Sequence, residues 1–311
     1  MKKILVTGAT GFVGANLVRR LVDENYQVYI LKRKNSNIWR IKDLISKIST
    51  FDIDLLEKQR LFKLVHKIKP RVIFHLANLG LYGGQDSSIE ESIKVNLLGT
   101  VNLIKSLDTV NYECFINTGS SSEYGTKVSP IKENDLCEPS TNYALSKLAG
   151  TIYAQAYAKQ NKKPLATLRL FSPFGPFDHP SRFITQTILK MFKNGDILIK
   201  NPNTVRDYIY VEDVVNAYLI CMQNPHKLSG EIFNIGMGKQ ICLKDVLKLL
   251  IKKIGSKSKI FYENSIKNEN MMWQADIKKA KTKLGWYPKK NLIRGFTETI
   301  KWFKENLYFY G

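Results

Sequence analysis

The chain has 311 residues, 44% of them hydrophobic, which is enough to bury a large core. Its 48 Lys and Arg outnumber 27 Asp and Glu, giving a formal net charge of +21. No apolar run approaches the roughly 18 residues that span a bilayer, so we expect no membrane partner. The 4 cysteines are widely spaced without a C-x-x-C pair, which predicts a reducing, cytoplasmic location and neither disulfides nor a metal site.

The basic residues are scattered along the chain, often as Lys-Lys pairs. Aromatic residues are not interleaved with them, as a surface that stacks nucleic-acid bases would require. We therefore expect no nucleic-acid partner. The charge predicts a lysine-rich surface whose field attracts an anionic substrate.

The first element is a short buried strand, Ile4-Leu5-Val6, followed by a glycine-rich turn and apolar residues at helical spacing. The glycine spacing is G-x-x-G-x-x-G, one residue away from the commoner dinucleotide motif. Such a turn lets the backbone approach a pyrophosphate, which the N-terminus of the next helix then faces. The residues expected at the pyrophosphate are Gly8, Thr10, Gly11, Phe12, Val13 and Gly14.

The second strand, Val28-Tyr29-Ile30-Leu31, ends in Lys32-Arg33-Lys34. A dinucleotide fold commonly carries Asp or Glu here for the ribose hydroxyls. A carboxylate would repel a 2′-phosphate, whereas a guanidinium binds one through paired hydrogen bonds. The cluster therefore predicts NADPH/NADP as cofactor, with NAD as the alternative. The other interpretation of these residues is a solvated basic loop.

Further along, expected helices over 55–68 and 93–104 alternate with strands at 72–74 and 114–117. This alternation predicts an α/β fold with a parallel, doubly wound sheet and ligands at the carboxyl ends of its strands. His75 has no second metal ligand or carboxylate at a suitable spacing, so we interpret it as a packed histidine. The loop at 79–88 either covers a substrate or only connects two elements.

The chemistry is predicted at two neighbouring motifs. The strand at 114–117 leads into a serine-rich segment, and Tyr143 and Lys147 then open a helix. Four residues apart, they project from one side of that helix. A lysine ammonium favours the phenolate of a nearby tyrosine, and a serine hydroxyl holds a reacting oxygen. The predicted catalytic residues are Ser120, Tyr143 and Lys147.

These motifs, in this order, resemble the extended short-chain dehydrogenase/reductase family, whose members are nucleotide-sugar epimerases, dehydratases and reductases. The resemblance runs from Lys3 to about Pro288. The further matching segments are His75-Leu76-Ala77, Asn96 in its V-N-L-L-G-T context, Arg169-Leu170-Phe171, Phe174-Gly175-Pro176, Arg206 to Val214, Phe233 to Gly236, and Leu284 to Pro288.

The resemblance implies a Rossmann-type sheet with a smaller C-terminal α/β lobe. Residues 1–168 and 203–224 would form the NAD(P)-binding domain, and residues 169–202 and 225–304 the substrate lobe. A homodimer would form by pairing the helices that follow positions 92 and 141. Residues 305–311 resemble an engineered protease site with one substitution, so they are left out of the predicted fold.

The resemblance also implies roles for single residues. Tyr143 would be the acid/base, Lys147 its electrostatic helper and ribose anchor, and Ser120 the partner of the reacting oxygen. Further cofactor contacts would come from Lys32, Arg33, Asp52, Ile53, Leu76, Ala77, Asn78, Asn96, Phe171 and Pro173. Substrate contacts would come from Leu81, Tyr82, Ser120, Ser121, Ser122, Ser172, Arg182 and Arg206.

Arg206 stands where the family binds the diphosphate of its substrate, and a guanidinium suits that task. The alternative is an ion pair with Asp207 or Asp213. The sequence also departs from the family pattern. Ser121 and Ser122 replace the acidic pair of the dehydratases, which argues against dehydration, and Ser172 replaces a common Asn.

These observations predict NADPH-dependent reduction of a nucleotide-diphosphate 4-keto-6-deoxy sugar. The first alternative is an NAD-dependent C4-epimerase, which would use the same serine, tyrosine and lysine. The second is a sensor that binds a dinucleotide without chemistry. The intact Ser120, Tyr143 and Lys147 argue against the sensor.

Overall fold

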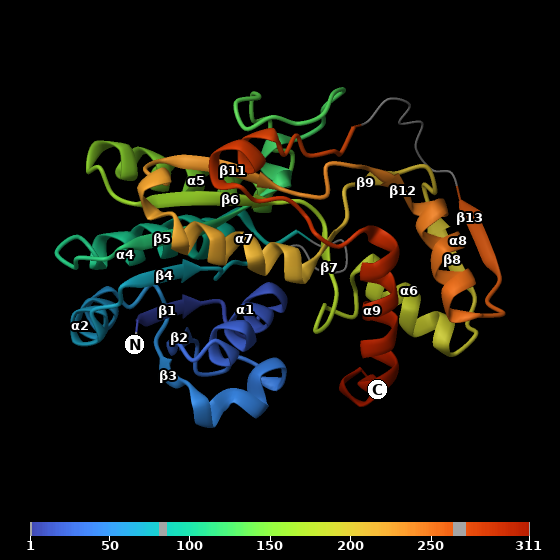
Figure 1. Ribbon diagram of the computed structural model, residues 1–311, viewed down its shortest axis with the longest axis horizontal. Helices are drawn as coiled ribbons and strands as arrows, with labels where there is room; N and C mark the ends of the chain where they lie inside the picture. Colours follow the sequence, from blue (N-terminus) through green and yellow to red (C-terminus); the bar gives the residue numbers. More distant parts are fainter. Residues whose placement is uncertain (1, 81–85, 264–271, 311) are drawn as a thin grey trace.

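The computed structural model describes residues 2–80, 86–263 and 272–310. Two of the predicted substrate residues, Leu81 and Tyr82, lie outside this part of the chain. Figure 1 shows a central sheet covered by helices on both faces and a smaller unit at one end. No described helix combines the length and apolar character needed to cross a membrane.

The central sheet has seven strands in the order β11-β6-β5-β4-β1-β2-β3, and all of them pair in parallel. The order reverses beside β1, where such sheets bind ligands at the carboxyl ends of their strands. The predicted Rossmann-type α/β fold is confirmed. The strands are β1 (Lys3–Thr7), β2 (Gln27–Lys32), β3 (Ser49–Asp52), β4 (Val72–His75), β5 (Cys114–Ser120), β6 (Leu165–Leu170) and β11 (Glu231–Ile235).

Both faces of this sheet are buried under helices. Successive side chains of a strand point to opposite faces, so each strand contributes to two apolar clusters. In β1, Ile4 and Val6 enter one apolar cluster and Leu5 enters the other. The first cluster is covered by α1 (Phe12–Asp23), η1 (Trp39–Lys47) and α7 (Val211–Gln223). The second is covered by α2 (Lys58–Ile68), α4 (Gly99–Ser106) and α5 (Asn142–Gln160), and α3 (Ile89–Ser92) and η2 (Ile93–Leu98) precede α4.

The smaller unit has an apolar core of its own, centred on Phe174, Ile188, Leu247 and Phe296. Its helices are α6 (Phe183–Phe192), α8 (Leu243–Ile254) and α9 (Leu292–Glu305). Its strands form three pairs, β7 (Pro173–Phe174) with β10 (Ile209–Tyr210), β9 (Val205–Arg206) with β12 (Ile241–Cys242), and β8 (Ile197–Lys200) with β13 (Ile260–Glu263). Short one-turn elements are η3 (Ser121–Tyr124), η4 (Pro225–Lys227), η5 (Ala280–Leu284) and η6 (Leu307–Phe309).

The division of the chain differs from the prediction at β11. The sequence placed residues 225–304 in the substrate lobe, yet β11 pairs with β6 at the edge of the central sheet. Trp286 also belongs to the core of that sheet, and its indole N–H donates to the Asp213 carbonyl at 3.0 Å. Ile232, Phe233 and Ile235 are buried there, and the pairing of β11 with β6 is what places them in the central sheet.

The C-terminal residues left out of the prediction are part of the fold. The Tyr310 hydroxyl donates to the Asp178 carbonyl at 2.8 Å. The Phe309 ring lies 5.0 Å from that of Trp39 in η1, so this segment contacts the sheet domain as well as the smaller unit. Aromatic contacts of this kind stabilise a fold through buried area and ring geometry.

Candidate active site

A cavity of about 520 Å³ opens at the carboxyl ends of β1, β2 and β4. Half of the residues predicted to bind a cofactor line it, and these are Gly8, Thr10, Gly11, Lys32, Arg33, Ile53, Leu76, Ala77 and Asn78. The parallel sheet brings them together from strands far apart in the sequence, because its carboxyl ends meet at one edge.

The glycine turn fits a dinucleotide. Gly8 has a φ of +70°, which an L side chain rarely adopts, and a Cβ at Gly14 would overlap the Gly8 carbonyl. The Gly11 amide donates to the Gly8 carbonyl at 3.0 Å and closes the turn. Helix α1 begins directly afterwards, and no side chain caps its first N–H groups. Unpaired N–H groups at a helix N-terminus suit a pyrophosphate.

The basic residues at the end of β2 differ in their surroundings. Lys32 pairs with Asp52, so part of its charge is neutralised by another residue predicted to contact the cofactor. Arg33 lines the cavity with Ser36 and Asn37 from the following loop. Arg33 is thus the basic group best placed for a 2′-phosphate, and the Lys32–Asp52 pair weakens the argument for NADPH.

Arg40 also lines this cavity, although the sequence analysis did not assign it. Its side chain is buried, and Nε donates to the Phe177 carbonyl at 2.7 Å. Nη1 donates to the Thr10 carbonyl at 3.3 Å, within the glycine turn. Arg40 therefore joins the cofactor turn to the smaller unit.

The other predicted cofactor residues do not line the cavity, and these are Phe12, Val13, Gly14, Asp52, Asn96, Tyr143, Lys147, Phe171 and Pro173. Asn96 supports the wall instead. Its side-chain oxygen accepts from the Leu79 amide at 2.8 Å, and its Nδ2 donates to Ser146 Oγ at 2.9 Å. Phe171 is fully buried, with its ring 6.5 Å from that of Tyr124.

Ser120 ends β5 and caps the one-turn element η3. Its Oγ accepts from the Ser122 amide at 3.1 Å, so its hydroxyl hydrogen can be donated to a substrate oxygen. Glu123 Oε1 accepts from the Ser120 amide at 2.8 Å, completing a reciprocal capping box. The turn therefore fixes the backbone that carries the predicted serine.

Helix α5 carries Tyr143 and Lys147. Its N-terminus is held by Thr141, whose hydroxyl accepts from the Ala144 amide at 3.0 Å. Asp86 accepts from the Tyr143 amide at 3.2 Å, as expected for a carboxylate at a positive helix end. Lys147 is buried, and this burial lowers its pKa to about 8, although the charge of Glu123 raises it.

Behind the catalytic turn lies a buried ion pair that the sequence analysis missed. Glu123 Oε2 accepts from Arg169 Nε at 2.7 Å, and Glu123 Oε1 accepts from the Thr151 hydroxyl at 3.1 Å. Glu123 is 0% exposed and Arg169 2%. The sequence does contain a signal for Glu123, because Ser120 and Glu123 have the spacing of a capping box.

His75 is a packed residue, as predicted. It is buried at the end of β4, where Nδ1 lies 2.7 Å from Thr7 Oγ1 and Nε2 lies 2.9 Å from Thr100 Oγ1. Burial and the charge of Lys147 lower its pKa to about 3. It therefore stays neutral at physiological pH and adds no charge to the site.

Arg206 lies on β9 with its guanidinium 4.9 Å from the Trp273 ring. Its Nη1 donates to the Val205 carbonyl at 2.7 Å. Neither acidic neighbour pairs with it in the described part of the chain, because Asp207 accepts backbone N–H groups of Met237, Gly238 and Ala275, and Asp213 those of Lys289 and Lys290. The alternative of an ion pair is therefore not observed.

The other predicted substrate residues occupy two places. Ser121 and Ser122 follow Ser120 in η3. The Ser172 carbonyl accepts from the Ile209 amide at 3.2 Å, which joins the segment after β6 to β10. Arg182 pairs with Asp178 at 3.2 Å and donates to the Pro173 carbonyl at 2.8 Å, so these contacts already fix its guanidinium.

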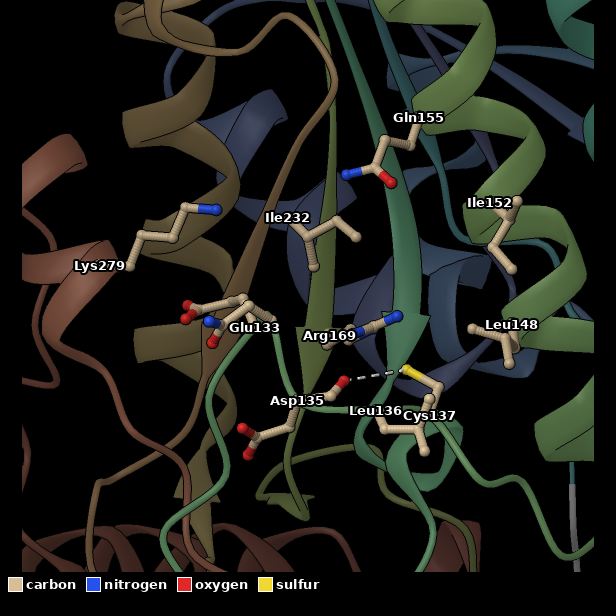
Figure 2. A pocket seen from close by; sticks show the side chains of 11 residues that line it. Glu133, Asp135, Leu136, Cys137, Leu148, Ile152, Gln155, Arg169, Ile232 and Lys279 are labelled. Carbon is tan, nitrogen blue, oxygen red and sulfur yellow. Dashed lines mark hydrogen bonds between the residues drawn. The ribbon is translucent and has the colours of Figure 1, made fainter.

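A second cavity, of about 690 Å³, lies between α5, the 133–137 loop and Lys279. Figure 2 shows the Arg169 side chain extending toward Cys137 at its wall. This cavity is larger than the first, but it contains neither the glycine turn nor any residue predicted to bind cofactor or substrate. We therefore assign the cofactor to the smaller cavity.

A model of the NAD dependent epimerase/dehydratase family matches residues 4–236. The chain belongs to this family. It is an NAD(P)-dependent enzyme of the extended short-chain dehydrogenase/reductase type, which confirms the predicted family and enzyme class. The sensor hypothesis is thereby weakened.

Three relatives illustrate the range of the family. The putative UDP-glucose 4-epimerase of Methanocaldococcus jannaschii is 28% identical, over 97% of this chain and 99% of that protein. The dTDP-4-dehydro-6-deoxyglucose reductase of Escherichia coli is 27% identical, with 96% of each chain covered. The Bacillus cereus UDP-glucuronic acid 4-epimerase, solved with UDP-glucuronic acid and NAD, is 26% identical with a TM-score of 0.86, covering 98% and 99% of the two chains.

Proposed function

We propose that this protein is a C4-epimerase of a nucleotide-diphosphate sugar. The buried Lys147 on the helix face of Tyr143, beside the turn that carries Ser120, supports redox chemistry at a sugar carbon. The observation that carries the choice of epimerisation is the pairing of Lys32 with Asp52. Relatives named as 4-epimerases span nearly the whole chain. Because Lys32 pairs with Asp52, the basic cluster argues less for NADPH, and epimerisation now stands ahead of reduction.

The residues of the site perform the proton chemistry. The dinucleotide supplies the redox chemistry at C4 of the sugar when it is bound. Tyr143 accepts the proton of the C4 hydroxyl as phenolate, and the Lys147 ammonium stabilises that negative charge. Ser120 donates its hydroxyl hydrogen to the C4 oxygen. The keto sugar then rotates in the site and presents its other face to the dinucleotide. Tyr143 returns the proton to the C4 oxygen, and the opposite C4 configuration results.

The remaining features support an anionic nucleotide substrate and a paired enzyme. Arg206 offers a guanidinium for the diphosphate, and the net charge of +21 attracts such a ligand. Leu98, Leu145 and Ile152 are 42%, 45% and 55% exposed on the segments that would pair in a homodimer. Burial of these apolar residues favours that homodimer. A cytoplasmic location accords with the free cysteines.

Reduction of a 4-keto-6-deoxy nucleotide sugar by NADPH is the second candidate. It is favoured by Arg33, which lines the cavity beside Ser36 where a 2′-phosphate would lie. The same Ser120, Tyr143 and Lys147 would serve it, with Tyr143 donating its proton to the keto oxygen.

Two parallel assays separate the candidates. In the first, purified protein is incubated with UDP-glucose or UDP-galactose and NAD, and the products are followed by NMR. In the second, a panel of nucleotide-linked 4-keto sugars is supplied with NADPH, whose oxidation is followed by absorbance. An epimerase interconverts the first pair without net cofactor change. Stoichiometric NADPH oxidation in the second assay alone would overturn the proposal in favour of reduction.

A further inference from the structure

We propose that Glu123 is the positioning residue of the active site, which locks the turn carrying Ser120 to the helix carrying Tyr143 and Lys147. Only the kinetic test of this inference rests on the proposed function. The carboxylate is enclosed, and both its oxygens accept hydrogen bonds from described residues.

The hydrogen bonds of Glu123 come from three different elements. The Ser120 amide at the end of β5 and the Thr151 hydroxyl on α5 both donate to Oε1. Arg169 on β6 donates to Oε2. Thr151 lies one helical turn beyond Lys147, on the same side of α5. A single carboxylate therefore fixes the separation between the serine and the helix face that bears the tyrosine and the lysine.

Arg169 holds this carboxylate from behind. Its guanidinium lies 4.3 Å from the Tyr124 ring, so an aromatic face as well as the ion pair fixes it. Its guanidinium lies at the wall of the second cavity, where the side chain extends toward Cys137 (Figure 2). The Glu123 carboxylate is therefore held between the arginine of β6 and the donors on β5 and α5.

The charge of Glu123 also acts on Lys147. Burial favours the neutral amine of this lysine, and Glu123 opposes that effect. The other titratable groups around Lys147 do not replace it. His75 on β4 is neutral, Tyr143 lies on the same helix, and Arg169 on β6 is itself paired with Glu123. Loss of the carboxylate charge would leave Lys147 without a counter-charge and lower its pKa further.

The test separates the charge of Glu123 from its hydrogen bonds. Lys147 is titrated by NMR in protein containing ¹³C-labelled lysine, with its signal assigned from a Lys147→Arg variant. Wild type is expected to titrate near pH 8, the pKa that burial gives Lys147. Glu123→Gln removes the charge and keeps one of the two acceptor oxygens, and it should lower the midpoint by about one pH unit. Thr151→Val removes one hydrogen bond and should leave the midpoint unchanged. This readout does not depend on turnover.

The kinetic test uses the same variants with saturating cofactor. We expect kcat to fall on the order of 10- to 100-fold in Glu123→Gln and about threefold in Thr151→Val, with KM for the sugar nucleotide nearly unchanged. If Glu123→Gln does not fold, Glu123→Leu with Arg169→Met replaces the ion pair by apolar side chains that pack. The double variant should show the same lowered midpoint.

The outcomes are distinguishable. An unchanged Lys147 midpoint in Glu123→Gln or in the double variant overturns the electrostatic role, and an unchanged kcat in Thr151→Val overturns the mechanical one. Wild-type protein that turns over no sugar nucleotide contradicts the proposed function. The titration still tests Glu123 in that case.

Discussion

At the residue scale, the site consists of a few polar side chains whose protonation is set by burial. Lys147 is buried near an ion pair, and its pKa of about 8 leaves it mostly charged at neutral pH. Ser120 is fixed by a capping box and retains a hydrogen to donate. Tyr143 is the group expected to exchange its proton with the sugar, which makes it the most direct target for substitution.

Tyr143→Phe removes the phenolic oxygen and leaves the ring. We expect kcat to fall by about 10²- to 10⁴-fold, because general acid–base catalysis contributes that much. Cofactor binding, measured by fluorescence titration, should change little. Turnover at the wild-type rate would instead show that Tyr143 is not the acid–base group.

The protonation of Lys147 predicts the alkaline limit of activity. The ammonium is the active form, so kcat/KM should fall as the pH rises through about 8. In Lys147→Arg, the guanidinium keeps its charge at higher pH, so this loss should move upward even if kcat is reduced. A pH–rate profile measures both. An identical alkaline limb in the two proteins would exclude Lys147 as its origin.

The sequence predicted the serine, tyrosine and lysine because their spacing and order carry the signal. Arg40 could not be found in this way. It lines the cavity and is held there by a hydrogen bond to the Phe177 carbonyl. These two residues are far apart in the sequence, so no local pattern predicts the contact. Glu123 could be predicted in part. Its capping-box spacing with Ser120 is visible in the sequence, but its partner Arg169 is brought near only by the β5–β6 pairing.

At the element scale, the turn between β1 and α1 is where we expect the cofactor to bind. The predicted strand, turn and helix are all present, because buried apolar residues and glycines specify them locally. The place of β11 was not predictable from its own residues. An apolar strand fits a sheet edge in either domain, and only its pairing with β6 decides.

Gly14→Ala tests the close packing of this turn. The added methyl group would overlap the Gly8 carbonyl, so we expect a loss of about 1–3 kcal/mol in the free energy of unfolding and much weaker cofactor binding. Gly195→Ala is the matched control, because its methyl group would meet only the Lys190 carbonyl at 3.5 Å. Denaturant unfolding should place the control within about 0.5 kcal/mol of wild type. Equal effects in both variants would contradict the assignment.

At the scale of the whole molecule, the predicted site residues are divided between two units. The central sheet presents the cavity to which we assign the cofactor, and the smaller unit, with its own apolar core, carries Arg206 on β9. The Phe177–His179 segment and the C-terminal residues join the two units at the edge of the cofactor cavity. The family resemblance implied two units, but long-range strand pairing sets the boundary between them.

The exposed apolar residues on α5 predict a surface that pairs with a second copy. Replacing both Leu145 and Ile152 with Lys should convert a homodimer to monomers, because burying unpaired charges at such an interface is costly. Leu198→Lys is the control, since this residue is 54% exposed on β8 of the smaller unit. Light scattering after size exclusion gives the mass. A wild-type monomer, or a dimer in the double variant, would refute this surface.

The fate of a label at C4 tests the central claim most directly. UDP-glucose carrying deuterium at C4 is incubated with the enzyme and NAD, and the product is examined by NMR and mass spectrometry. We predict UDP-galactose that retains the deuterium, because the hydrogen removed at C4 is returned to the same carbon within one site. Loss of the label to solvent, or no product from any C4-labelled nucleotide sugar, would contradict the account.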